Sequence, residues 1–136
     1  MNGYQYVALR CVPRVDREEF VNVGVVLYCQ AADFLGSASL VDEGRLRALD
    51  AGIDVDAVRH ALDAVEQVCR GAAHVDFDVG SRATAYGERD GRDDPSTRFG
   101  FLRAPRSTVV QPGPVHGGLT DDPAAELQRL LERLVG

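Results

Sequence analysis

The chain has 136 residues, a formal net charge of −6, 45% hydrophobic residues and 26% charged residues. This length is typical of one domain, and the composition excludes a chain that is disordered throughout. No apolar run approaches the roughly 20 residues of a membrane-spanning helix. We expect no secretory signal, because the first residues lack a basic region followed by an apolar stretch.

Three strands are predicted in the N-terminal part of the chain, because apolar residues alternate with others over short runs. They are Tyr4–Val12, Phe20–Cys29 and the weaker Phe34–Val41. The alternation in the second strand places four apolar residues on one face: Val21, Val23, Val25 and Leu27. Gly24 in mid-strand indicates a bulge or a close approach of another backbone. Short connections favour an antiparallel meander of the three strands.

Two long helices are predicted further along the chain. Val55–Arg70 has apolar residues at spacings of three and four, with Asp54 as its N-cap and Gly71 at its end. The final helix begins at Pro123 after the N-cap Asp122. Its apolar stripe consists of Leu127, Leu130, Leu131 and Leu134.

The segment between these helices is rich in turn-forming residues. Gly80–Pro95 contains almost nothing to bury and is predicted to be an exposed loop. Phe99–Leu102 and Ser107–Gln111 are predicted to be short strands. The elements together predict one α+β domain over residues 1–136, with a mostly antiparallel sheet of about four to five strands packed against two long helices. We expect both helices in one layer, on the sheet side that carries Val7, Leu9, Val23 and Val25.

Arginines occur in two segments that lack acidic residues. Residues 95–120 contain three arginines and no acidic residue, and residues 1–15 are also free of acidic residues. If these segments meet in the sheet, Arg10, Arg98 and Arg106 form a basic patch suited to a phosphate, a carboxylate or an acidic partner surface. The remaining negative charge disfavours duplex nucleic acid. The alternative is a set of solvated arginines that balance their neighbours.

The second side of the first two strands is a candidate binding surface. It carries aromatic and polar side chains, namely Tyr4, Tyr6, Arg10, Phe20, Asn22 and Tyr28. This composition is typical of interfaces and ligand sites. The alternative is that a loop or the C-terminal segment covers this side, so that the tyrosines are core residues.

His116 is the candidate acid or base, because it is held among prolines and glycines and a histidine can serve in either role near neutral pH. A histidine bonded to backbone carbonyls is the alternative. The cysteines and the other histidines are isolated, and no phosphate loop occurs, so we expect no metal and no cofactor. We expect Cys11 and Cys29 to be buried, and three unpaired cysteines to indicate a cytoplasmic location.

Two stretches resemble a known family. They are the strand Tyr6–Arg10 with Glu19–Tyr28, and Arg98–Pro112 followed by His116-Gly and by Asp121–Leu127. Together they resemble the bacterial family called domain of unknown function 3037 (DUF 3037) over nearly the whole chain. The resemblance implies no activity. It places polar motif positions on Arg10, Glu19, Asn22, Arg98, Arg106, Ser107 and His116. It also implies a partner, because family members are often encoded beside a kinase-like protein resembling the HipA fold.

Three kinds of function fit the sequence. The first is a small accessory protein that binds the HipA-like kinase, with an anion-accepting surface formed by Arg10, Asn22, Arg98, Arg106, Ser107 and His116. The second is a small enzyme for a phosphorylated or carboxylated substrate, with His116 as acid or base. The third is a structural homodimer module that uses a sheet edge or the tyrosine side. Whether the chain is an enzyme stays open, and we expect no membrane partner.

Overall fold

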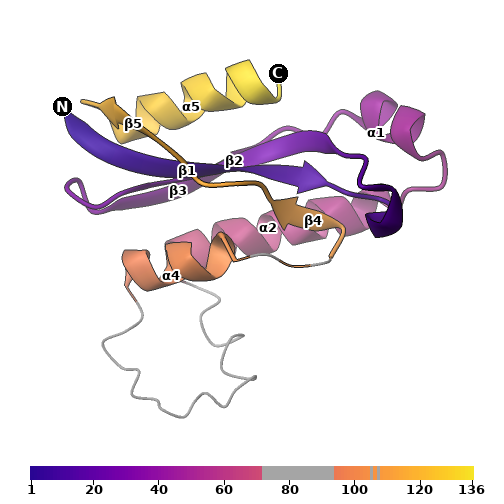
Figure 1. Cartoon of the computed structure of the whole chain (residues 1–136), viewed down its shortest axis with the longest axis horizontal. Coiled ribbons are helices and arrows are strands. Elements are labelled where there is room, and N and C mark those ends of the chain that lie inside the picture. The colour runs from indigo at the N-terminus through magenta and orange to yellow at the C-terminus, as the bar shows by residue number, and fades with distance from the viewer. Residues whose placement is uncertain (72–93, 105, 107) are drawn as a thin grey trace, which may run out of the picture.

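The fold is built on a sheet of five antiparallel strands centred on β1. The computed structural model describes residues 1–71, 94–104, 106 and 108–136. The strands are β1 (Asn2–Cys11), β2 (Val21–Cys29), β3 (Phe34–Ser39), β4 (Val110–Pro112) and β5 (His116–Thr120). Their order is β3-β2-β1-β4, and β5 pairs with β1 beside β4, so that β4 and β5 share one edge of β1 (Figure 1). The predicted α+β class with a mostly antiparallel sheet is confirmed.

The helices of the described chain begin at aspartate caps. They are α1 (Glu43–Leu49), α2 (Val55–Arg70), α4 (Pro95–Leu102) and α5 (Pro123–Leu134), besides a short 3-10 turn η1 (Val15–Arg17). Each α-helix follows an aspartate whose side chain accepts a hydrogen bond from a backbone N–H of the first turn: Asp42, Asp54, Asp94 and Asp122. Gly71 ends α2 at a φ of 79°, which glycine adopts without steric cost. The predicted caps of the two longest helices are therefore confirmed.

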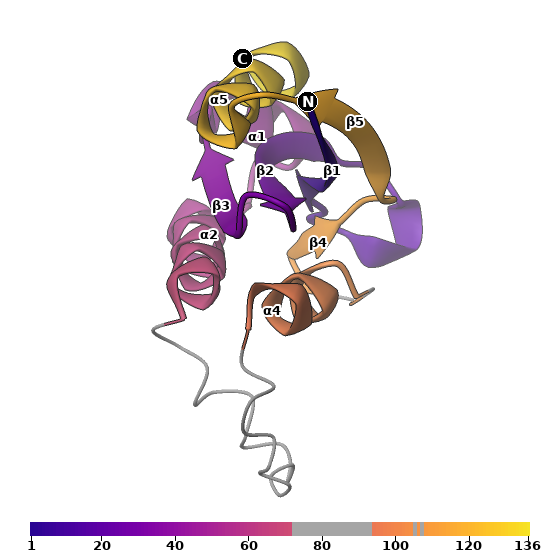
Figure 2. The same cartoon turned by 90° about the vertical axis from the view of Figure 1, so that its left-hand side faces the viewer.

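Helices cover both faces of the sheet. Figure 2 shows α5 over one face and α2 with α4 against the other. One buried cluster joins β1 and β2 to α2 and α4, and its members include Val7, Leu9, Val26, Leu62 and Phe99. A second buried cluster joins β2 to α5, and its members include Val25, Leu27, Leu127 and Leu130. The prediction of a single helical layer is wrong, because α5 lies on the opposite face from α2.

A β-bulge in β2 explains this difference. Leu9 lies opposite Gly24, whereas Arg10 lies opposite Asn22, so Val23 is an extra residue in β2. The bulge that Gly24 predicts is confirmed. An extra residue reverses the alternation of every side chain that follows it.

The reversal divides the apolar residues of β2 between the two faces. Val21 and Val23 pack with the α2 and α4 layer. Val25 and Leu27, beyond the bulge, pack with α5. The predicted common face of these four residues is therefore wrong, and both faces of β2 are apolar enough to bind helices.

Phe99–Leu102, predicted to be a strand, is the second half of α4. The helix starts because Asp94 caps it and Pro95 occupies its first turn, where a missing N–H costs nothing. The predicted exposed loop Gly80–Pro95 lies outside the described residues, apart from these two.

The C-terminal strands also differ from the predicted elements. The strand predicted at Ser107–Gln111 corresponds to β4, which begins only at Val110. The residues around His116, predicted to be a loop, form β5. Both strands gain backbone partners from β1, and such tertiary pairing overrides a weak local pattern.

Candidate functional site

Arg10 lies near the C-terminal end of β1. Its cross-strand neighbours are Asn22 on β2 and Gln111 on β4. Its guanidinium carbon lies 4.0 Å from the centre of the Phe20 ring. The same carbon lies 3.1 Å from the position that a Cβ atom on Gly113 would take. We call these five residues the Arg10 surface.

The guanidinium of Arg10 lacks an acceptor. Its Nε atom is buried without a hydrogen-bond partner, and the guanidinium forms no hydrogen bond or ion pair within the described chain. A buried donor without an acceptor costs about 1–3 kcal/mol. Phe20 and the backbone at Gly113 hold the planar group in place. Its N–H groups are thus preorganised for a carboxylate or a phosphate.

The two amides beside Arg10 fix the surrounding backbone. Asn22 donates from Nδ2 to the carbonyl oxygen of Leu134 at 3.2 Å, which ties β2 to the end of α5. Gln111 donates from Nε2 to the carbonyl oxygen of Thr108 at 2.9 Å, which closes the turn before β4. The Arg10 surface is therefore bounded by α5 on one side and by this turn on the other.

Arg98 and Arg106 lie with α4, on the other face of the sheet. The guanidinium of Arg98 lies 3.5 Å from the position of a Cβ atom on Gly71, at the end of α2. Arg106 donates from Nη2 and Nε to the carbonyl oxygens of Phe101 and Ala104, and stacks 4.8 Å from the centre of the Phe101 ring. Burial lowers the pKa of Arg106. These contacts satisfy carbonyls at the end of α4, so Arg106 acts as a C-terminal cap.

His116 is exposed at the first position of β5, opposite Tyr6 of β1. The centres of the two rings are 5.3 Å apart. Arg10 is four residues further along β1 than Tyr6, a separation of about 13 Å in a strand. Ser107 lies outside the described residues. Of the predicted site residues, the structure brings Arg10 and Asn22 together and places Arg98, Arg106 and His116 elsewhere.

The tyrosines predicted on one face are divided by the sheet. Tyr4 is buried in the cluster under α5 and Tyr6 is half-buried against that cluster, so neither lies on an open surface. Tyr28 lies on the opposite face, where its ring stacks 5.4 Å from that of Phe99. The tyrosines therefore contribute packing, and Arg10 is the residue of this predicted face that remains a candidate for binding.

Residues 6–135 match the model of a protein family described as a protein of unknown function, DUF3037. The chain belongs to the DUF3037 family. Comparison with curated proteins and with solved structures gave no match. The resemblance noted in the sequence is confirmed, and the DUF3037 description states no activity.

Cysteine chemistry has little support in this DUF3037 chain. All three cysteines are buried and unpaired. Burial raises the pKa of Cys11 and that of Cys69 to about 11, so both remain thiols at neutral pH. In the described part of the chain, no group of three or more His, Cys, Asp and Glu residues could hold a metal ion. None of the described helices is long and apolar enough to cross a membrane.

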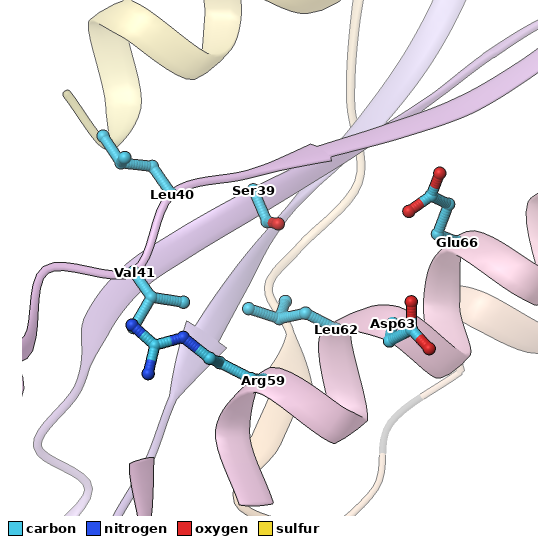
Figure 3. A pocket seen from close by; sticks show the side chains of 7 residues that line it. All are labelled: Ser39, Leu40, Val41, Arg59, Leu62, Asp63 and Glu66. Atoms are coloured by element: carbon cyan, nitrogen blue, oxygen red, sulfur yellow. The ribbon is translucent and has the colours of Figure 1, made fainter. Parts of the chain in front are cut away.

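The DUF3037 fold also contains a groove that sequence reasoning missed. It lies between β3 and α2, has a volume of about 350 Å³ and is drawn in Figure 3. Its lining residues are Ser39, Leu40, Val41, Arg59, Leu62, Asp63 and Glu66. No local motif marks such a groove, because it depends on how α2 crosses the edge of the sheet. Gly113 was missed for the same reason, although its place between two prolines is a signal of a constrained turn.

Proposed function

We propose that this DUF3037 protein is a binding protein whose Arg10 surface accepts a carboxylate or phosphate group of a protein partner. The observation that carries the proposal is the guanidinium of Arg10, held against Phe20 while its buried Nε lacks an acceptor. An anion that binds the Nη groups of this guanidinium supplies an acceptor that the described chain does not provide. A charge-assisted hydrogen bond of this kind contributes about 1.5–3 kcal/mol.

Exposed apolar side chains support a protein partner rather than a small ion. Phe20, on whose ring the Arg10 guanidinium stacks, is 44% exposed, and Val15 in the preceding η1 turn is 49% exposed. Arginine and aromatic side chains are enriched among the residues that dominate the binding energy of protein interfaces. A partner surface can cover Phe20 while one of its acidic or phosphorylated residues contacts Arg10.

The partner we propose is the HipA-like kinase that the family resemblance implies. A kinase transfers phosphoryl groups, so its phosphorylated residues, as well as its acidic side chains, are suitable anions for Arg10. The small protein then acts as an accessory subunit of that kinase.

Co-purification of the two proteins, followed by titration calorimetry, tests the proposal. We expect Arg10→Ala to weaken the complex about 10- to 100-fold, which corresponds to the loss of one charge-assisted contact. Arg10→Lys should restore affinity only in part, because lysine cannot form the bidentate contact. Arg14→Ala is the matched control, since Arg14 is an exposed arginine outside the Arg10 surface.

Two results would overturn the proposal. One is the absence of any complex with the kinase. The other is an equal effect of Arg10→Ala and Arg14→Ala, which would reduce the role of Arg10 to general charge. The melting temperature of each variant shows whether the fold is retained.

The enzyme alternative has weaker support. In the described chain the ring of His116 contacts Tyr6, and the arginines that would clamp a substrate lie on other elements. General acid–base catalysis needs the catalytic group within hydrogen-bond reach of the bound substrate. We therefore place the function of the chain in recognition rather than in chemistry.

A further inference from the structure

We propose that the outer edge of β3 binds an extended segment of a partner protein that carries a basic side chain. This surface is separate from the Arg10 surface, and the proposal does not depend on the function proposed above. Three features support it: the open backbone of β3, the absence of edge protection, and an uncompensated acidic residue in the adjacent groove.

Alternate residues of β3 direct their backbone N–H and C=O groups outward, away from β2. β3 is the last strand in the strand order, and Figure 2 shows it at the margin of the sheet between α5 and α2. Leu40 donates its N–H to the carbonyl oxygen of Val23 at 2.9 Å, so Leu40 faces β2. Alternate residues of a strand direct their N–H and C=O groups to the same side. The groups that point outward therefore belong to the intervening residues Leu35, Ser37 and Ser39.

Nothing in the sequence of β3 protects this edge. Phe34–Ser39 contains no charged residue and no proline, although proteins usually place such residues on exposed edge strands. At the opposite edge of the sheet, Pro112 is the last residue of β4 and Pro114 lies between β4 and β5. An uncharged edge with unpaired backbone groups is the kind of strand to which an extended peptide is added.

The groove beside β3 selects the chemistry of the added segment. Arg59 is paired with Glu43 at 3.2 Å, and Glu66 is paired with Arg70 at 2.6 Å. Asp63 has no ion pair within the described chain, so its charge is uncompensated.

A strand added to β3 directs alternate side chains toward the α2 face, where the groove lies. Leu62 rises from α2 toward Ser39 in Figure 3, and the carboxylate of Asp63 lies on the same helix. A lysine or arginine side chain fits this groove, because its apolar stem packs on Leu62 while its charged end reaches Asp63.

Selection of peptides on the 136-residue chain tests this inference. The probe is a phage library of random eight-residue peptides, from which the enriched sequences are synthesised. We expect the enriched peptides to share an arginine or lysine. Their addition should shift the NMR amide signals of Leu35, Ser37 and Ser39. Asp63→Asn should weaken binding about three- to fivefold, the range of an exposed ion pair. Asp56→Asn, on the same helix but outside the groove, should change little.

A backbone variant tests strand addition itself. Ser39→Pro removes an outward N–H while leaving the bonds to β2, and we expect it to weaken peptide binding at least tenfold. Ser39→Ala keeps that N–H and is the matched control. If Ser39→Pro does not fold, the inference is tested by the effect of Asp63→Asn on peptide binding and by the positions of the shifted amide signals.

The inference is overturned if no peptide is enriched, or if the shifted signals lie on other elements. It is also overturned if the peptides bind Asp63→Asn as well as the unaltered chain. Sedimentation analysis tests whether a second copy of the chain occupies this edge. A dimer whose β3 amides are protected from hydrogen exchange without peptide would assign the edge to that second copy.

Discussion

The hydroxyl of Tyr4 on β1 donates a 2.9 Å hydrogen bond to Oε2 of Glu126 on α5. Arg129 donates to the other carboxylate oxygen of Glu126 at 2.6 Å. The Tyr4 ring also fills the space over Gly118 of β5, where a Cβ atom would lie 2.6 Å from the Tyr4 hydroxyl oxygen. One buried tyrosine therefore joins the central strand, the edge strand β5 and the helix that covers them.

Tyr4→Phe should destabilise the protein by about 1–3 kcal/mol at pH 7, through the loss of a hydrogen bond to a charged group. Burial, and next the hydrogen bond to Glu126, raise the pKa of Tyr4 from 10.0 to about 12. The folded chain thus holds this proton more tightly than the unfolded chain. The stabilisation is complete below pH 10 and is lost as the pH rises through 12. Chemical denaturation at pH 7, 10 and 12 measures this, with Tyr28→Phe as the control. A difference that stays constant with pH would contradict it.

Glu126→Gln should show the opposite dependence on pH. The hydrogen bond from Arg129, followed by that from Tyr4, lowers the pKa of Glu126 despite the opposing effect of burial. A carboxyl with a lowered pKa stabilises the fold above its unfolded pKa, here about 4.5, and ceases to do so as the pH falls through the folded value. The variant should therefore be less stable than the unaltered chain at pH 7 and approach it in acid. Glu132→Gln, an exposed change on the same helix, should show no such convergence in urea titrations.

Gly24→Ala should destabilise the protein by about 1–3 kcal/mol, because overpacking in a tight interior forces the backbone to shift. A Cβ atom at Gly24 would lie 2.9 Å from the carbonyl oxygen of Ala38, a backbone atom that cannot move away cheaply. Gly3→Ala is the matched control in β1, since nothing lies within 4 Å of a Cβ atom there. Equal urea midpoints for the two variants would show that the bulge tolerates a side chain.

Gly24 also shows how far sequence reasoning reaches in this fold. A glycine inside an apolar strand predicts a bulge, and the bulge is present, but its effect on alternation depends on which residue becomes the extra one. The pairing of β1 with β2 determines which residue is the extra one, and the sequence of β2 alone does not reveal it. Helix ends were predictable from Asp54, Gly71 and Asp122, because capping is a local interaction.

The candidate site was predictable only in part. Arg10 was recognised from its position on a polar strand face, and Asn22 from the strand that pairs with it. Arg106 was grouped with Arg10 because both lie in acid-free segments, yet charge content does not reveal which carbonyls a guanidinium meets. The contact of Arg106 with the end of α4 could not be predicted, because the pattern of Phe99–Leu102 indicates a strand and not the helix that is present.

Leu130→Ala should destabilise the protein by about 2–5 kcal/mol, the cost of a cavity left by a fully buried leucine. Leu130 is fully buried between α5 and the sheet. Leu119→Ala on β5 is the control, because Leu119 is 65% exposed. Thermal unfolding followed by circular dichroism gives both values. A small effect of Leu130→Ala would mean that α5 packs loosely on its face.

Arg106→Ala should lower the melting temperature, because the change removes the guanidinium hydrogen bonds to the carbonyl oxygens of Phe101 and Ala104. The expected loss is about 1 kcal/mol, the usual net value of a hydrogen-bonding cap. Arg103→Ala is the matched control, since Arg103 is exposed next to the same helix end. If Arg106→Ala instead leaves the thermal stability unchanged and weakens binding of the kinase, the result would support the anion-binding role predicted from the sequence.

The pairing of β4 and β5 with one edge of β1 has a consequence for synthesis of the protein on the ribosome. More than a hundred residues separate Tyr6 from its partner His116. At the usual elongation rate this length of chain takes about 5–20 s to make. During that interval the first strand has β2 as a neighbour on one side and an unsatisfied hydrogen-bonding edge on the other. The growing chain is therefore exposed to wrong strand pairing at this edge until β4 and β5 have been translated.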